Sequence, residues 1–397
     1  GGQDIANSNF FAEFARMQGV CAANFLCGSI VPFFGPTIPD PLRNITENKI
    51  RNLAAFGMIN YKITDALGLT VEARYASEKV KQTATLQNLD LPVTAVVEAE
   101  ETFNSFNPRV TLDWQVTDAN MLYVLYAEGN KPGGFNSATA IQAGLPVYDE
   151  ETVESFEIGS KNLFLDGQMI FNFAGYFNRI KGYQLTQNAR TGTNTTSAIT
   201  NAGNADITGF EISVVLQPEA AEGFTITTNW AYNDSEFTEG FDENQGVLND
   251  VADNGLVDCS TGSQFPDLPD CVSAYGSIEG KQIPRTAKNQ FYLDFDFRRP
   301  FANLSGWYWF VGANYFFESS KFAQVLNLAE TGSAELVSAR AGMYNDRWNF
   351  QLWGRNLTGE DHVPSVLRYA EPTGFTRNFA ASLRRDTYFG LTATMNF

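Results

Sequence analysis

The chain has no long run of apolar residues. No segment of its 397 residues approaches the roughly 18 consecutive apolar residues that a membrane-spanning helix needs. The polar opening Gly1-Gly-Gln-Asp4 also lacks the features of a secretory signal peptide. We therefore expect no transmembrane helix, and we expect the natural protein to begin before Gly1.

The chain also has little positive charge. It has 27 Lys and Arg residues against 45 Asp and Glu residues, a formal net charge of -18 at pH 7. Binding to the phosphates of a nucleic acid needs clustered basic residues, and the sequence has no such cluster. We expect no nucleic acid among the partners.

Histidine is nearly absent. His362 is the only one, so a Ser-His or a metal-His site would have to use it. Its surroundings, Asp361-His362-Val363-Pro364, include no nucleophile motif such as G-x-S-x-G. We expect no enzymatic activity.

Cysteine is scarce and falls in turn-rich sequence. The four cysteines are Cys21, Cys27, Cys259 and Cys271. Sequence alone permits three connectivities, and nearness along the chain favours Cys21 with Cys27 and Cys259 with Cys271. A structural zinc site needs spacings such as C-x2-4-C, which neither pair has. Two loop disulfides would indicate an oxidising compartment, such as the bacterial periplasm or the cell surface.

Much of the acidity lies in residues 234–270, which contain no Lys or Arg. The simplest interpretation is a solvated loop. The alternative is a calcium site that uses Asp250, Asp253 or Asp258, since calcium prefers carboxylate oxygens. The spacing matches no EF-hand loop. We expect no other cofactor.

Alternation of apolar and polar residues is what the sequence has in abundance. It runs through residues 110–116, 210–216 and 291–297 and through the last nine residues, 389–397. A period of two describes a strand with one apolar face. The opposite faces of the first three segments carry Arg, Asp or Glu, and that of the last carries small and polar residues, so the apolar faces must lie together on one side of a sheet.

The length of the alternating segments favours a membrane over a soluble core. Soluble strands are typically about 5–6 residues long, whereas a strand that crosses a bilayer needs roughly 9–11 tilted residues. Lipid offers no hydrogen bonds, so a spanning sheet must close into a barrel. The 33 Phe residues agree with the aromatic girdles of such barrels. We predict an all-β, antiparallel transmembrane barrel in the outer membrane of a bacterium, in contact with its lipid and lipopolysaccharide.

Thirteen strands are predicted. They lie near residues 51–63, 67–80, 106–116, 120–129, 152–163, 169–183, 205–216, 222–236, 286–297, 307–318, 335–345, 348–358 and 384–397. Short turns, such as Thr64-Asp65-Ala66 and Asn345-Asp346-Arg347, alternate with long polar loops, as the periplasmic and external sides of outer-membrane barrels do. Bacterial barrels of one chain have an even number of strands, so this odd number predicts further strands before Gly1. Residues 1–48 would be an external loop region, and residues 49–397 would hold the strands and long external loops.

Charged side chains on the polar faces of these strands should point into the barrel. On the lipid face, an Arg or Lys near the midplane would cost about 2–4 kcal/mol. Pairing with one another or with a plug is their simplest role, and a direct role in substrate passage is the alternative. They are Glu72, Arg74, Arg109, Asp113, Glu157, Lys161, Glu211, Asp294, Asp296, Arg340 and Arg355.

Several segments together resemble the barrel of a known family. They are Leu53 to Tyr75, Tyr126-Ala-Glu-Gly-Asn-Lys-Pro-Gly-Gly-Phe-Asn136, Glu154-Ser-Phe-Glu-Ile-Gly-Ser-Lys161, and Trp348 to Thr358 with the terminal Phe397. In this order they resemble the C-terminal barrel portion of a TonB-dependent receptor, and the resemblance covers most of residues 50–397.

The resemblance implies a 22-stranded barrel closed by an N-terminal plug. The first predicted strand would then be the tenth, so the plug, the TonB box and nine strands would lie outside this chain. It implies a receptor that binds a scarce nutrient complex outside the cell and imports it with energy delivered by TonB. A ferric siderophore is the default substrate, and cobalamin, a carbohydrate or another metal chelate are alternatives.

Ligand contacts are expected from the external loops, because loops on a rigid scaffold carry specificity. These loops lie near residues 1–48, 81–104, 130–151, 184–204, 237–285, 319–334 and 359–383. The candidate contacts are Phe135, Asn136, Tyr148, Arg190, Tyr275, Arg368 and Tyr369. A passive porin is the alternative from another functional class. Chain length and segment order argue against it.

The pairing of Cys259 with Cys271 can be tested directly. A disulfide there closes a loop of about a dozen residues and would contribute roughly 3 kcal/mol in the chain-entropy model. In the unreduced natural protein, an alkylating reagent should modify neither thiol until a reductant is added. Rapid labelling of both thiols without reductant would show that they are not bridged.

Overall fold

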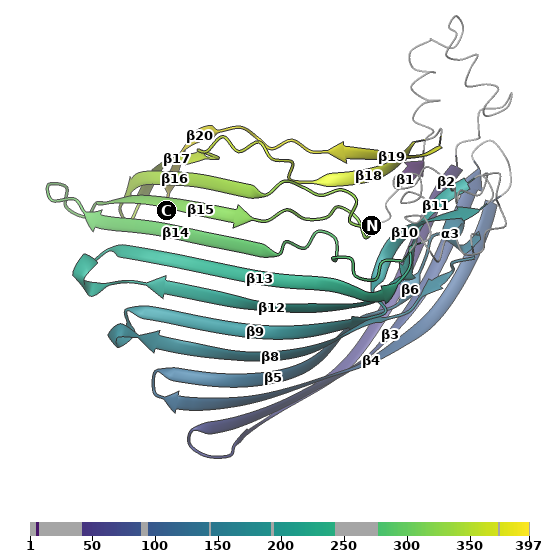
Figure 1. Ribbon diagram of the computed structural model, residues 1–397, viewed down its shortest axis with the longest axis horizontal. Coiled ribbons are helices and arrows are strands. Elements are labelled where there is room, and N and C mark those ends of the chain that lie inside the picture. Colours follow the sequence, from purple (N-terminus) through teal and green to yellow (C-terminus); the bar gives the residue numbers. More distant parts are fainter. Residues whose placement is uncertain are drawn as a thin grey trace, which may run out of the picture.

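One antiparallel sheet dominates the fold. The computed structural model describes residues 5–7, 42–88, 94–142, 144–191, 194–242, 277–371 and 374–396. Within these ranges, 14 strands form one sheet in which each strand pairs with the next one along the sheet (Figure 1). They are β1 (Ile5–Asn7), β2 (Leu42–Lys62), β3 (Leu67–Asn88), β4 (Thr94–Thr117), β5 (Asn120–Lys131), β8 (Glu151–Phe164), β9 (Met169–Lys181), β12 (Gly203–Leu216), β13 (Phe224–Gly240), β14 (Asn289–Pro300), β15 (Tyr308–Glu318), β16 (Ala334–Tyr344), β17 (Trp348–Arg355) and β20 (Tyr388–Met395).

The thirteen longer strands correspond one to one to the thirteen predicted strands, which confirms the all-β antiparallel fold. The three-residue β1 was not predicted; it pairs with the start of β2. Short connections join the strands at one end of the sheet, for example residues 118–119 between β4 and β5 and residues 345–347 between β16 and β17. The longer connections lie at the opposite end (Figure 1). Adjacent strands are therefore joined as predicted.

The first three long strands are longer than predicted. They have 21, 22 and 24 residues, so β2 begins at Leu42 rather than near residue 51. The prediction of an external loop over 81–104 is wrong for most of that range, because β3 continues to Asn88 and β4 begins at Thr94. The hairpin there carries several charged residues at polar positions. Lys79 and Lys81 bind Glu100 and Glu98 across the two strands, and such pairs stabilise a hairpin that is exposed to water.

The register assigns every side chain to one of two faces. Residues that stand directly opposite each other in an antiparallel pair point to the same face, and neighbours along a strand point to opposite faces. Asp294 stands opposite Asn314 on one side and Thr227 on the other. We call the face that carries Asp294 the inner face, and the opposite one the outer face.

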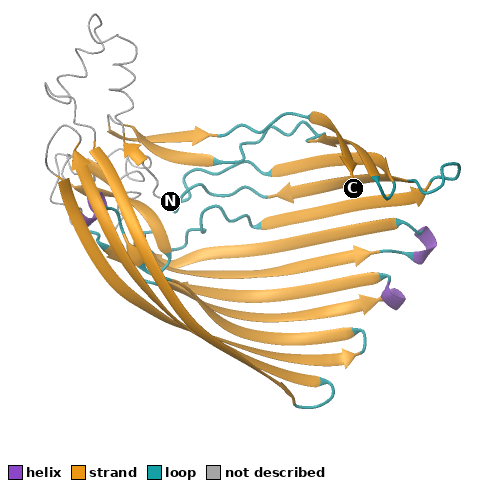
Figure 2. Cartoon of the chain, turned by 180° about the vertical axis from the view of Figure 1, so that it is seen from behind, coloured by secondary structure: helices purple, strands orange, loops and turns teal. Residues whose placement is uncertain are grey.

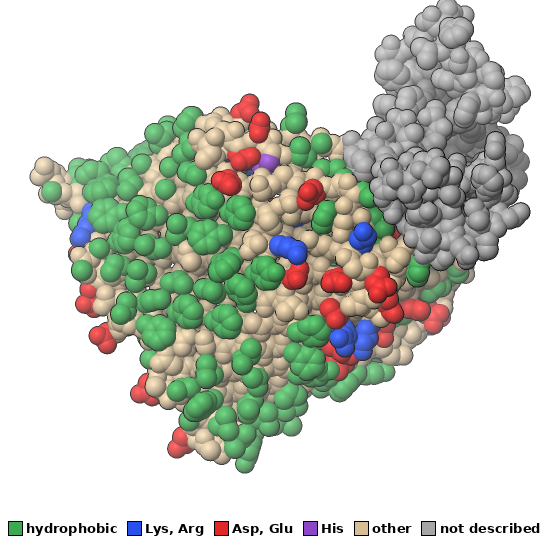
Figure 3. Space-filling view, in the orientation of Figure 1, with side chains coloured by type: hydrophobic (Ala, Val, Ile, Leu, Met, Phe, Trp, Pro, Cys, Tyr) green, Lys and Arg blue, Asp and Glu red, His purple; other side chains and the backbone are tan. Residues whose placement is uncertain are grey.

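The outer face is apolar in its middle. Phe291, Leu293, Phe295 and Phe297 alternate with the inner-face residues of β14, and Figure 3 shows a broad band of hydrophobic side chains there. Large exposed hydrophobics on other strands continue the band: Val110, Leu112, Leu122, Val124, Ile158, Val311, Leu352 and Leu391. Aromatic and β-branched side chains suit this pleated surface. A band of this kind is what a lipid environment requires of a spanning sheet.

Ion pairs mark the edge of this band toward the longer connections. Glu154 binds Lys181 at 2.6 Å, Arg179 binds Asp206 at 3.1 Å, and Asp234 binds Lys288 at 2.8 Å. The first two pairs join outer-face residues of adjacent strands. The third joins Asp234 of β13 to Lys288, the residue just before β14. Charged groups gather at this end of the face in Figure 3. Since unpaired charges are costly in lipid, the edge limits how deeply the sheet can be immersed.

The longer connections contain small elements of their own. They are β6 (Gly134–Phe135), α3 (Ala138–Gln142), β7 (Val147–Tyr148), β10 (Gln184–Thr191), β11 (Asn194–Asn201), β18 (Val366–Glu371) and β19 (Gly374–Ala381). Two 3-10 turns, η2 (Leu165–Gly167) and η3 (Glu219–Ala221), lie at the other end. Figure 2 shows how small the helical parts are. In the described part of the chain, no helix is long and apolar enough to cross a membrane.

A compact hydrophobic core lies on the inner face at the end that carries the longer connections. Phe237 at the end of β13 is fully buried and packs with Ala205 of β12. Ile278, Ile283, Val325 and Leu326 come from the connections that follow β13 and β15. These connections therefore fold back over the inner face, and we call this end of the sheet the mouth.

The assignment of faces predicts opposite results for two adjacent residues. Replacing Leu293 with Arg puts a charge on the outer face and should impair membrane insertion by about 2–4 kcal/mol near the midplane. Replacing Asp294 with Asn changes the inner face and should leave insertion intact. Heat-modifiable migration of the refolded natural protein measures both. If the Asn variant fails to assemble while the Arg variant is normal, the register is wrong by one residue.

Candidate ligand-binding mouth and inner wall

All eleven charged residues that were predicted to face the lumen lie on the inner face. The registers can be followed from β3 to β17: Glu72 stands opposite Arg109, Lys161 opposite Asn172, and Glu211 opposite Ala174. From Asp294 the same face continues through Gly312 to Arg340 and then to Arg355. Their placement on one face agrees with the sequence prediction, and their contacts with a plug or a substrate remain predictions.

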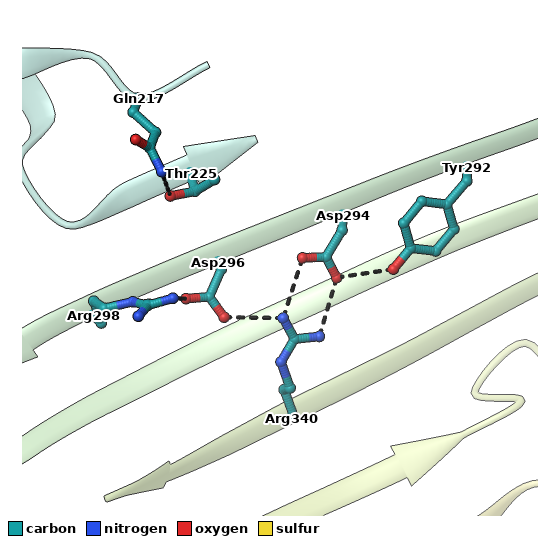
Figure 4. A network of polar contacts seen from close by, with 7 residues as sticks. All are labelled: Gln217, Thr225, Tyr292, Asp294, Asp296, Arg298 and Arg340. Atoms are coloured by element: carbon teal, nitrogen blue, oxygen red, sulfur yellow. Dashed lines mark hydrogen bonds and ion pairs between the residues drawn. The ribbon is translucent and has the colours of Figure 1, made fainter. Parts of the chain in front are cut away.

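Arg340 is the centre of the densest polar network on this wall. Its two terminal nitrogens donate to the two carboxylate oxygens of Asp294 at 3.0 and 3.1 Å, and one of them also donates to Asp296 at 2.9 Å. Arg298 binds the other oxygen of Asp296 at 3.1 Å. Figure 4 shows Arg340 pointing at both carboxylates. Two-pronged contacts between Arg and carboxylates are strong and directional, so these four charges neutralise one another.

A glycine makes this network possible. Arg340 is on β16 and the two aspartates are on β14, so the guanidinium must cross β15. Gly312 stands opposite both Asp296 and Arg340. A Cβ atom at this position would lie 2.8 Å from Cζ of Arg340. The missing side chain lets the arginine lie flat on the wall, and sequence reasoning missed this role because the three residues are far apart in the chain.

The other inner-face charges have more varied surroundings. Tyr123 donates to Glu157 at 2.6 Å, and Lys161 lies 5.9 Å from the centre of the Tyr123 ring. A hollow of about 410 Å³ is lined by Lys161, Glu211 and Tyr123 together with Asn229 and Tyr292. The wall is therefore hollowed here, and the hollow is lined by these polar groups together with apolar ones such as Ala231 and Phe316.

The remaining predicted residues of the wall lie on β3 and β4 toward one edge of the sheet and on β17 toward the other. Arg109 binds Glu72 at 3.5 Å, and Arg355 lies 5.2 Å from the Trp353 ring centre. Arg74 lines a smaller hollow of about 150 Å³. The Asp113 carboxylate lies against Gly68, where a Cβ would be 2.8 Å away. These residues do not converge on one site.

Side-chain amides brace the mouth on the side of β5 and β8. Nε2 of Gln184 donates to the carbonyls of Pro132 and Asp149, each at 2.9 Å. Asn201 donates to Gly182 and Asp149 at 2.8 and 3.0 Å. Each amide satisfies backbone groups of a neighbouring segment, as buried polar groups require. These connections are thereby fixed to one another.

Asn136 belongs to these braces, and the expectation that it contacts a ligand is corrected. Its side chain donates to the carbonyl of Ile199 at 2.9 Å and accepts from the amide of the same residue at 2.7 Å. Only 5% of Asn136 is exposed. Both ends of the amide are occupied, so Asn136 holds β11 against the β6 connection.

The other candidate ligand contacts lie in different surroundings. Phe135 is partly exposed at the mouth. Tyr148 is half-buried, its burial raises the pKa of its phenol, and its ring lies where a side chain at Gly134 would stand. Arg190 is in β10, and Arg368 and Tyr369 are in β18. Their side chains lie outside the described parts of the chain.

Several predictions lie outside the described residues altogether. They concern Tyr275, the cysteines Cys21, Cys27, Cys259 and Cys271, and the calcium ligands Asp250, Asp253 and Asp258. Within the described ranges, no group of three or more His, Cys, Asp or Glu side chains is arranged to hold a metal ion.

His362 is at the mouth, in the segment that follows β17. Only 7% of its side chain is exposed. Its Nε2 accepts from Nη2 of Arg384 at 3.1 Å, because an arginine can only donate. Nδ1 then carries the proton and lies 3.4 Å from Glu360. Burial and the neighbouring Arg384 lower the pKa of His362.

Stability should therefore depend on pH through His362. The folded pKa lies below the ordinary value of 6.5, so the unfolded chain binds this proton more readily. The stabilisation is complete above about pH 6.5 and is lost as pH falls through the folded pKa. Amide hydrogen exchange of residues 356–365 and 382–387, corrected for intrinsic rates, should accelerate toward acid pH in the natural protein. In the variant His362→Gln, this extra acceleration should be absent; its persistence would show that another group titrates.

Comparisons with known proteins agree with the geometry. Residues 23–357 match the family described as TonB dependent receptor-like, beta-barrel. Over 164 residues, the chain is 28% identical to the probable TonB-dependent siderophore receptor PiuA of Acinetobacter baumannii; this segment is 40% of the chain and 20% of that protein.

Solved structures share the fold. The ferric yersiniabactin uptake receptor FyuA of Yersinia pestis matches with a TM-score of 0.67 at 15% identity over 90% of this chain and 47% of that chain. The copper transporter OprC matches with a TM-score of 0.59 at 12% identity over 90% of this chain and 50% of that chain. The chain thus spans about half the length of these receptors. Since the family match covers most of an antiparallel sheet with an apolar outer face and a polar inner one, the chain belongs to the TonB-dependent receptor β-barrels of the bacterial outer membrane.

Proposed function

We propose that this barrel belongs to a receptor that imports a ferric siderophore. The observation that carries the proposal is the sequence match to PiuA, which is named as a probable siderophore receptor. FyuA, which shares the fold, is named as a receptor for the uptake of ferric yersiniabactin. A siderophore complex is a large, oxygen-rich chelate, and the braced mouth offers a fixed surface of polar and aromatic groups on which such a complex can rest.

The form of the mouth supports a receptor rather than a passive pore. Helix α3 contacts both β3 and β11, although four strands of the sheet separate β3 from the β10–β11 hairpin. The connections therefore reach across the inner face. Energy coupling through a plug, a TonB box and TonB is part of the proposal and rests on the family alone.

Copper is the best-supported alternative cargo, because OprC shares the fold and is named a copper transporter. Cobalamin, a carbohydrate and other metal chelates are further alternatives. A catalytic role finds no support, since the family consists of receptors.

Uptake in the natural host tests the proposal. Cells that lack the gene should lose uptake of radioactive iron from at least one of three chelates: a tris-catecholate, a tris-hydroxamate or ferric citrate. The gene should restore uptake, but not in cells without TonB. Normal uptake of all three chelates without the gene would contradict the siderophore assignment, and loss of copper or cobalamin uptake instead would identify the alternative. A large steady conductance of the purified full-length protein would indicate a porin.

A further inference from the structure

Arg285 has an unusual backbone conformation at the mouth. Its φ is +62°, in the left-handed region that residues with a Cβ atom avoid. Four other described residues that are not glycine share a positive φ. Leu165 and Asp166 lie in a turn at the far end, and the remaining two are Asn327 and Asn356. Asparagine tolerates this conformation well. Among the described residues of the mouth, Arg285 is therefore the one with a positive φ that is neither glycine nor asparagine.

The strained conformation is held in place by its surroundings. The amide of Arg285 donates to the carbonyl of Phe322 at 2.9 Å. Asn327 donates to the carbonyl of Gln282 at 2.9 Å and accepts from its amide at 2.7 Å. Ile283, two residues before Arg285, is buried in the inner-face core. The segment is therefore tied to the connection after β15 on both sides of the strained residue.

The side chain of Arg285 is available to another molecule. Arg285 is exposed, and the ion pairs found among the described residues do not include it. Arg340, by contrast, is held by Asp294 and Asp296. The backbone is thus held in a costly conformation, and no ion pair among the described residues offsets the charge of the side chain.

The segment that carries Arg285 lies against the inner-face core at the mouth, because Ile283 is buried in that core. Tyr183 packs edge-on against Phe237 of the core, with the ring centres 5.2 Å apart. Burial and the Glu151 carboxylate raise the pKa of Tyr183, and the charge of Arg285 acts in the opposite direction. The charge of Arg285 therefore acts on the phenol of Tyr183, whose ring packs against the inner-face core.

We propose that Arg285 is an anchor for the anionic oxygens of the ligand. This inference rests on the proposed function. A planar guanidinium can donate two parallel hydrogen bonds to a carboxylate or to the paired oxygens of a catecholate. Strained residues persist where function selects them, and a glycine at this position would remove the strain and the charge together. The assigned ligand class is a chelate with net negative charge.

The variant Arg285→Gly separates binding from stability. Affinity of the full-length receptor for its ferric chelate should fall at least about tenfold. The thermal midpoint should stay unchanged or rise, because glycine adopts a positive φ without strain and this gain offsets the greater freedom of the unfolded chain. Arg285→Lys keeps the charge but loses the planar fork, so its affinity should lie between those of the other two proteins.

Lys288 provides the matched control. It is three residues away and also exposed, but it is bound to Asp234 at the edge of the outer face. Lys288→Gln removes the same charge and should leave affinity unchanged. The probes are ferric tris-catecholate and ferric citrate, which are anionic, and a neutral ferric tris-hydroxamate.

Three results would overturn the anchor. In the first, Arg285→Gly binds as tightly as the natural protein. In the second, it loses affinity and thermal stability together, which would give Arg285 a structural role. In the third, the receptor binds only the neutral chelate. A natural protein that binds none of the three chelates would instead overturn the proposed function, and the anchor with it.

Discussion

The requirement that a sheet in lipid satisfy all its backbone hydrogen bonds while keeping one face apolar governs this structure. Each long strand pairs with the next, and the register then sends every second side chain to the outer face. A slip of one residue in any strand would move its charges into lipid. The apolar band, the ion pairs at its edge and the polar inner wall all follow from this arrangement.

Charged residues that the outer face excludes lie on the inner face. Some of them pair with one another, and others line a hollow. Arg340 and Arg298 neutralise Asp294 and Asp296, and Arg340 reaches them across a glycine, so this part of the wall presents little free charge. Between β5 and β12, Lys161 and Glu211 line a hollow instead. At the mouth, the side-chain amides of Gln184 and Asn201 join neighbouring connections. Amides both donate and accept, so they can satisfy backbone groups without leaving a buried charge.

Errors in the strand limits have a common physical cause. The loop over residues 81–104 was predicted as a long polar connection, yet Lys79 and Glu100 are partners in a hairpin that continues beyond the apolar band. Outside lipid, both faces of a strand tolerate polar residues. The alternation of apolar and polar residues therefore no longer shows where the strand begins or ends. Asn136 was misjudged for a related reason. From the sequence, a polar residue in a loop is expected to be free to contact a ligand. The hydrogen bonds of Asn136, however, are made with Ile199, which is 63 residues away in the chain.

The sequence by itself determined the fold class, the order of the thirteen long strands, the sides of the short and long connections, and the face on which each predicted wall charge lies. These properties follow from a local period of two and from turn residues, which are visible in any short window. Tertiary structure alone decided which wall charges pair, that Gly312 gives Arg340 its path, that amides join the connections at the mouth, and that Arg285 is held at a positive φ. Those features depend on segments that are distant in the chain and meet only when the sheet has curved and the connections have folded over its inner face.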